Sequence, residues 1–229
     1  MRNLLYAATA LVAVAAIPAA ANATTILSFG QALGGDPITA TANAVTGVTT
    51  IDTVNAQVTV TSIIGNPLLI TPQLLTLHAT SVGPATLVGG KVNQAFSGTF
   101  SILAGPQNIL SGTFTDSVFG SGTALTLSAS NSTPGEVVDF TSNVIPLNLL
   151  GSPDGISLSF ADVNPAASLV GTGCAINPSI APCTLAGFTS SITGTFNAAA
   201  VPTPEPASLA LMGVGLLGLG FVTSRKRGV

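Results

Sequence analysis

The chain has few charged or chemically reactive side chains for its 229 residues: no Trp, one Tyr, one His, two Cys, and 6% Asp, Glu, Lys and Arg combined. Between residues 24 and 201 the only cation is Lys91, against seven acids, so this part has a net charge of 1 − 7 = −6. Binding to nucleic acid needs clustered Lys and Arg that neutralise phosphates. The composition therefore excludes nucleic acid as a partner, and it disfavours an anionic lipid surface for the same reason.

The residue types that usually carry catalysis are scarce and poorly arranged. His78 is the only histidine, and the alternation around it places it on the polar face of a strand. No Gly-x-Ser-x-Gly or His-Glu-x-x-His motif supplies it with a nucleophile, an orienting carboxylate or a metal. Glu136 and Asp139 are the closest acids, but three residues apart on a strand they face opposite ways, which disfavours a glycosidase pair. We expect no catalytic residue, no cofactor and no metal site.

What the chain does have is the pattern of antiparallel strands. Apolar and polar residues alternate over 54–61, 125–129 and 156–160, and every second residue from Val54 to Val60 is apolar. A period of two, with Gly and Pro between the runs, is typical of strands that are buried on one face. We predict an all-β ectodomain over residues 24–197, built as an antiparallel β-sandwich.

A five-residue motif occurs three times, at 96–100 (Phe-Ser-Gly-Thr-Phe), 110–114 (Leu-Ser-Gly-Thr-Phe) and 192–196 (Ile-Thr-Gly-Thr-Phe). In a strand, the first apolar residue, the glycine and the Phe share the inner face, and the two hydroxyl residues lie outside. A glycine between large inward side chains leaves room for a neighbouring ring. We interpret the motif as packing chemistry rather than as a repeated binding blade.

The N-terminus has the three parts of a secretory signal peptide. Arg2 supplies the positive charge, residues 4–17 are apolar, and Ala21-Asn22-Ala23 places small residues at the two positions that signal peptidase reads. We predict a signal helix over residues 1–23 that is cleaved after Ala23. An uncleaved anchor is the alternative, and the proline at position 18 disfavours it.

Export fixes the expected state of the two cysteines. Cys174 and Cys183 lie nine residues apart, and an oxidising compartment favours a disulfide between them. Closing so short a loop should stabilise the fold by about 2–3 kcal/mol.

The C-terminus carries three features in immediate succession. Pro204-Glu205-Pro206 ends a Pro-rich linker (residues 198–206), an uncharged run follows over 207–223, and Arg225, Lys226 and Arg227 lie in the tail 224–229. As a helix the 17-residue run is about 26 Å long, at the short end of what spans a bilayer. The basic cluster then stays in the cytoplasm. We predict a single transmembrane helix over 207–223.

This order of tripeptide, apolar span and basic cluster resembles the PEP-CTERM sorting signal of Gram-negative bacteria. The resemblance covers only about the last 26 residues. It implies that exosortase, a membrane protease, recognises Pro204, Glu205 and Pro206, removes the helix and passes the protein to the cell surface or the exopolysaccharide matrix. A plain stalk before a permanent anchor is the alternative.

We therefore expect an exported protein, transiently anchored in the membrane, with signal peptidase and exosortase as processing partners. A structural or adhesive role in exopolysaccharide or biofilm comes first, because the surface is hydrated, nearly uncharged and able to form many weak hydrogen bonds with polysaccharide. A membrane-tethered ligand- or carbohydrate-binding module is the second interpretation. An enzyme, in which His78 or Glu136 meets a partner from distant sequence, is the third.

Overall fold

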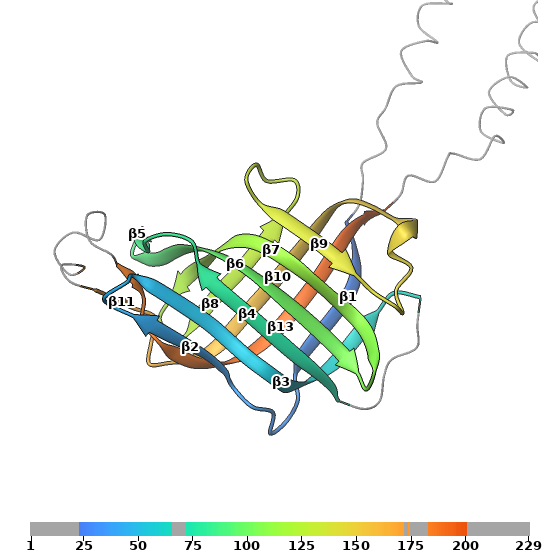
Figure 1. Cartoon of the computed structure of the whole chain (residues 1–229), viewed down its shortest axis with the longest axis horizontal. Helices are drawn as coiled ribbons and strands as arrows, with labels where there is room; N and C mark the ends of the chain where they lie inside the picture. The colour runs from blue at the N-terminus through green and yellow to red at the C-terminus, as the bar shows by residue number, and fades with distance from the viewer. Residues whose placement is uncertain (1–22, 66–71, 172–173, 175–182, 201–229) are drawn as a thin grey trace, which may run out of the picture. The chain divides into compact units, whose positions relative to one another are not determined.

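A single antiparallel sheet curls until its ends meet, so that eight of its strands form a closed barrel (Figure 1). Strand β13 lies between β1 and β10, and the pairing of β6 with β7 closes the ring. In order around the barrel the strands are β6 (Lys91–Ala104), β4 (Gln73–Ser81), β3 (Val48–Ile63), β1 (Ala23–Gln31), β13 (Phe188–Ala200), β10 (Leu150–Asn164), β8 (Ala124–Ser130) and β7 (Gln107–Ser121).

Shorter elements attach to this ring. Strand β2 (Ile38–Asn43) pairs with β3 and β13, and β5 (Thr86–Val88) forms a hairpin with β6. Strand β9 (Val137–Thr141) continues the course of β8 along β7, after an excursion of the chain through residues 131–136. A 3-10 turn at Leu147–Leu149 precedes β10, and β11 (Leu169–Val170) pairs with β12 (Thr184–Leu185) in a separate two-stranded sheet.

The structure is a computed structural model that describes residues 23–65, 72–171, 174 and 183–200. These residues belong to one compact unit, residues 22–200. The described part contains no helix that is long and apolar enough to cross a membrane. The predicted signal helix and the predicted span at 207–223 lie outside the described residues.

The all-β prediction is confirmed, whereas the two-sheet sandwich is not. Both architectures bury every second residue of each strand, so the alternation in the sequence is the same for both. Which of the two forms depends on pairings between strands that are distant in sequence, such as β1 with β13. Closure of the ring pairs both edges of these long strands and leaves none of the eight as a free edge.

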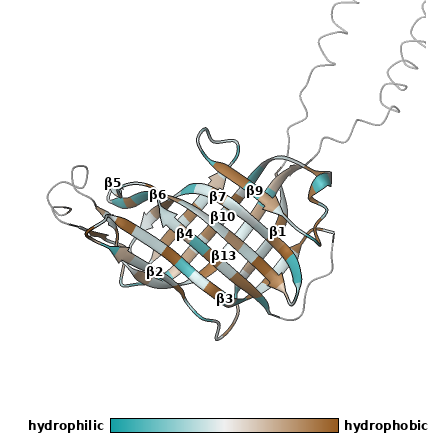
Figure 2. Ribbon diagram, in the orientation of Figure 1, coloured by the Kyte–Doolittle hydropathy of each residue, from teal (hydrophilic) through white to brown (hydrophobic). Residues whose placement is uncertain are grey.

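The core is the inside of the barrel, and it follows the predicted alternation over much of the chain. Leu125, Leu127, Leu158 and Phe160 are all buried, and Figure 2 shows apolar bands alternating with pale ones along the strands. Val54 is an exception, because it was predicted to face inward and is 68% exposed.

A β-bulge explains the position of Val54. The register between β3 and β4 shifts between Thr53 and Ala56, and Asn55 has a left-handed backbone with φ of 58°. A bulge inserts an extra residue and restarts the alternation. Thr53 and Ala56 therefore face the core, and Val54 faces solvent.

The repeated motif packs as predicted, with its glycines facing aromatic rings. Gly98 pairs with Phe114, and Gly112 pairs with Phe100, across the β6–β7 hairpin. A Cβ atom on Gly98 would lie 2.7 Å from the Phe114 ring, so only glycine fits there without a shift. Gly194, in the third copy, faces the Phe29 ring of β1 in the same way. The absent side chains thus make room for the rings that fill the barrel.

Candidate functional site

The outer surface of the barrel carries hydroxyl side chains in register across neighbouring strands. Strands β8, β10, β13 and β1 are consecutive in the wall, and their outward positions form two rows. We call these residues the Ser/Thr face. In the first row Ser128 pairs with Ser157, Ser157 with Thr195, and Thr195 with Ser28; in the second, Thr126 pairs with Ser159, and Ser159 with Thr193.

The first row continues beyond these four strands. Ser117 of β7 pairs with Ser128, and Ser62 of β3 pairs with Ser28, so that six consecutive strands each contribute one hydroxyl. Neighbouring strands are about 4.8 Å apart, and residues two apart along a strand are separated by about 7 Å. The Ser/Thr face is therefore a regular grid of hydroxyl groups.

The hydroxyls of the Ser/Thr face have no partner within the described part of the protein: none of its seven side chains takes part in a hydrogen bond there. Some hydroxyls elsewhere on the surface are used within the protein. Ser111 Oγ and Thr141 Oγ1, for example, lie 2.8 Å apart, and Thr115 Oγ1 accepts a hydrogen bond from the Val137 amide. Each hydroxyl of the Ser/Thr face is thus available to a partner outside the chain as both donor and acceptor.

A histidine and an acid meet on the outer wall at the neighbouring strands β3 and β4. His78 on β4 is exposed, as predicted, and its Nδ1 lies 3.5 Å from Oδ1 of Asp52 on β3. The sequence analysis missed this partner, because the pairing depends on the register of two strands 26 residues apart. Thr99 is the next residue in the row, across β6. All three side chains are exposed on the outer wall of the barrel, which does not provide the enclosed setting in which a general base works best.

A groove of about 510 Å³ lies where the excursion between β8 and β9 passes over the β6–β7 hairpin. Its floor is a block of paired residues on the two strands, and Pro134, Gly135 and Glu136 form one wall. The lining residues are Val82, Ala95, Phe96, Ser97, Thr115, Asp116, Ser117, Pro134, Gly135 and Glu136. Glu136 is held there, because its Oε2 accepts a 2.7 Å hydrogen bond from the Ser130 amide. Asp139, by contrast, is an exposed residue of β9.

Asp116 is a buried acid that the sequence analysis did not single out. It is 5% exposed, and its Oδ2 has no hydrogen-bond partner among the described residues. Burial raises the pKa of Asp116 to about 7, despite a hydrogen bond from the Ser117 amide, and the charge of Glu136 adds to the rise. The alternation in the sequence could have indicated this burial, since Asp116 occupies the inward position between Phe114 and Val118.

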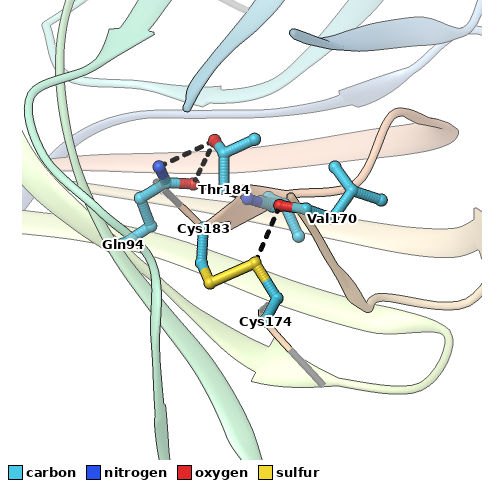
Figure 3. The surroundings of a disulfide bond; sticks show 6 residues. Gln94, Val170, Cys174, Cys183 and Thr184 are labelled. Carbon is cyan, nitrogen blue, oxygen red and sulfur yellow. Dashed lines mark hydrogen bonds between the residues drawn. A yellow bond between two sulfur atoms is a disulfide. The ribbon is translucent and has the colours of Figure 1, made fainter. Parts of the chain in front are cut away.

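The predicted disulfide between Cys174 and Cys183 is present, with the two Cα atoms 5.5 Å apart (Figure 3). It precedes a buried segment that Gln94 of β6 holds in place. Gln94 Nε2 donates to Thr184 Oγ1, and Gln94 Oε1 accepts from the Leu185 amide, both at 2.9 Å. The pair therefore acts as a structural staple beside a satisfied polar network.

The predicted processing residues lie at or beyond the ends of the described region. Ala23, after which we predict cleavage, is the first residue of β1 and pairs with Ala199. Strand β13 continues to Ala200, so residues 198–200, assigned above to the linker, belong to the barrel. Ala21, the tripeptide at 204–206 and the basic cluster at 225–227 lie outside the described residues.

Comparison with known proteins bears on the tail alone. Residues 202–226 match the family model of the PEP-CTERM protein-sorting motif, as the sequence resemblance implied. No curated protein and no solved structure matches the chain significantly. The motif indicates an exported protein that is processed by exosortase and sorted through the membrane to the cell surface.

Proposed function

We propose that this exported protein is a non-enzymatic, structural or adhesive component of an extracellular polysaccharide matrix. The observation that carries the proposal is the outer surface of the barrel, where Ser and Thr hydroxyls form rows across neighbouring strands. Such a surface is hydrated and nearly uncharged, and it offers many weak hydrogen bonds to a hydroxyl-rich polymer. The sorting motif at 202–226 supports delivery to the outside of the cell.

The closed barrel suits this role physically. Its long strands are paired on both edges, which protects an exported protein against edge-to-edge aggregation. The disulfide and the buried Gln94 network add rigidity to the segment before β13. A rigid body with a large hydroxyl surface can cross-link polymer chains without chemical change.

The test is a cell-fractionation experiment in the native host. We expect the wild-type protein in the extracellular matrix fraction. A variant with Pro204→Ala, Glu205→Gln and Pro206→Ala should remain with the membrane, because the tripeptide no longer directs processing. Thr203→Ala, one residue before the tripeptide, is the matched control and should still reach the matrix. Absence of the wild-type protein from the matrix would contradict the proposal.

A second candidate is a membrane-tethered ligand- or carbohydrate-binding module, which the groove between the β6–β7 hairpin and residues 134–136 favours. Its volume of about 510 Å³ suits a small molecule, and hydroxyl and carboxyl groups line it. Pro134→Gly and Glu136→Gln should weaken binding of an oligosaccharide in the groove, but they should leave matrix localisation unchanged. Retention of the wild-type C-terminus in the membrane would favour this candidate over the first.

A further inference from the structure

We infer that a patch on the outer wall of the barrel binds an acidic sugar unit, a uronic acid, of the matrix polysaccharide. The patch consists of Val88, Lys91, Asn93, Phe119 and Thr126, and we call it the Phe119 patch. The inference rests on the proposed function, because it names the place on the barrel that holds a polysaccharide and the class of sugar held there.

The register of four strands assembles the Phe119 patch. Lys91 pairs with Val88 across the β5–β6 hairpin, Asn93 pairs with Phe119 of β7, and Phe119 pairs with Thr126 of β8. All five residues occupy outward positions of their strands. Directly paired side chains on one face of a sheet are about 5 Å apart at Cβ, so one sugar ring can contact several of them at once.

The patch brings together two residue types that are scarce on this protein. Residues 24–201 contain nine Phe, of which eight are buried, whereas Phe119 is 40% exposed. Lys91 is the only cation of the same region, and its Nζ lies 5.1 Å from the centroid of the Phe119 ring. The one exposed Phe ring and the one cation of the described residues are therefore neighbours.

The neutral members of the patch match the other features of a sugar. The Phe119 ring and the exposed Val88 offer an apolar surface to the C–H groups of a sugar ring. The Asn93 amide and the Thr126 hydroxyl can donate to and accept from sugar hydroxyls. Neither side chain forms a hydrogen bond with another described residue. An apolar surface with a few polar groups around it is typical of small-ligand sites.

Lys91 makes the patch selective for an acidic sugar. It forms no ion pair with any described residue. Its contact with the ring is weak at an exposed site, and its stem is flexible. The ammonium group can therefore turn to a sugar carboxylate and donate a charge-assisted hydrogen bond to it. A neutral sugar does not gain this interaction.

The negative charge of the whole region does not prevent this binding. Salt at physiological ionic strength screens charges that are more than about 8 Å apart, so the immediate surroundings of the patch decide. The outward residues that flank Phe119 along β7 are Ser117 and Ser121, which are both neutral. The attraction to Lys91 is thus not opposed by an acid at these positions.

Other partners fit the Phe119 patch less well. A stable protein interface needs about 800 Å² from each partner and about 20–30 residues, whereas this patch has two exposed apolar side chains. An anionic lipid surface is recognised by about 4–8 clustered cations, and Lys91 stands alone. A single acidic sugar ring matches both the size and the charge of the patch.

The experiment uses the full chain in mild non-ionic detergent, with Phe119→Trp as the parent variant. Tryptophan keeps an aromatic ring in the patch, and because the chain has no other Trp, its fluorescence reports on the patch alone. The titrants are trigalacturonate and trimannuronate, which are acidic trisaccharides, and maltotriose, which is neutral. Thermal unfolding followed by circular dichroism checks that each variant is folded.

Three substitutions in this parent separate local charge from net charge. Lys91→Gln removes the cation, Lys91→Arg keeps it, and Gln57→Glu makes the same change in net charge as Lys91→Gln at an exposed position on β3. We expect Lys91→Gln to bind an acidic trisaccharide about fivefold more weakly than the parent, because the charge-assisted hydrogen bond is lost. Lys91→Arg and Gln57→Glu should bind within about twofold of the parent.

Two results would overturn the inference and leave the matrix role to the fractionation experiment. The first is equal affinity of the parent and Lys91→Gln for both acidic trisaccharides, or no change in fluorescence with either of them. The second is equal affinity of the parent for maltotriose and for the acidic trisaccharides, since the patch would then not select charge.

Discussion

Replacing Asp116 by asparagine should make the protein more stable at neutral and alkaline pH, with little effect in acid. Burial raises the pKa of this carboxyl from its ordinary value of 3.8 to about 7. The folded protein therefore retains a proton between these values that the unfolded chain releases. Below pH 3.8 the carboxyl is protonated in both the folded and the unfolded state, so it does not lower the free energy of unfolding. As pH rises from 3.8 to 7 the free energy of unfolding falls, and above 7 the penalty is complete.

The size of this penalty follows from the two pKa values. A difference from 3.8 to about 7 corresponds to about 4 kcal/mol, at about 1.4 kcal/mol for each tenfold change in proton affinity. Asp116 lines the groove beside Glu136, and access of water there should reduce the cost to about 2 kcal/mol. Asparagine has the same shape and still accepts the hydrogen bond from the Ser117 amide, but it carries no charge.

The assay is urea unfolding at pH 4, 6 and 8, with the protein in mild detergent. Circular dichroism is the signal, since residues 24–201 hold no Trp and no Tyr. Asp116→Asn should gain about 2 kcal/mol over the wild type between pH 4 and pH 8. Ser190→Ala is the control, because Ser190 Oγ is also buried without a partner in the described region but does not titrate. Parallel pH dependence of the wild type and Asp116→Asn would refute the reasoning.

Three further substitutions test the packing of the barrel. Gly194→Ala should lower the stability by about 1–3 kcal/mol, because the Cβ of the alanine would collide with the Phe29 ring. Gly30→Ala is the control: its Cβ would meet its nearest atom at 3.9 Å, so it should leave the stability almost unchanged. Thermal unfolding measures both. Gln94→Met should lower the free energy of unfolding in urea by about 2–3 kcal/mol, because the buried Leu185 amide loses its acceptor. An unchanged urea midpoint would mean that the Gln94 network does not stabilise the fold. Replacing both cysteines by alanine should lower the stability by about 2–3 kcal/mol, and equal midpoints for reduced wild type and the double variant would confirm that the disulfide alone is responsible.

The sequence predicted local features well, because these depend on neighbouring residues. The inward faces of Leu125 and Phe160, the ring-facing glycines and the disulfide all follow from spacing within one or two strands. Val54 was placed wrongly, because a left-handed Asn55 creates a bulge that no residue type in this segment required.

The features that the sequence did not predict depend on pairings between distant strands. Alternation is the same in a sandwich and in a barrel, so the closure by β6–β7 and by β13 between β1 and β10 could not be deduced from it. The Ser/Thr face has the same origin, since Ser128, Ser157, Thr195 and Ser28 come from four strands and meet only through their register. Asp52 meets His78 in the same way.

The most direct test of the sorting and matrix role is intact-mass analysis of the protein from its native host, after separation of membrane and extracellular matrix fractions. The account predicts a matrix species that begins at Thr24 and ends near Pro204, without the apolar run or Arg225, Lys226 and Arg227. A membrane species that retains the complete C-terminus, with none in the matrix, would contradict it.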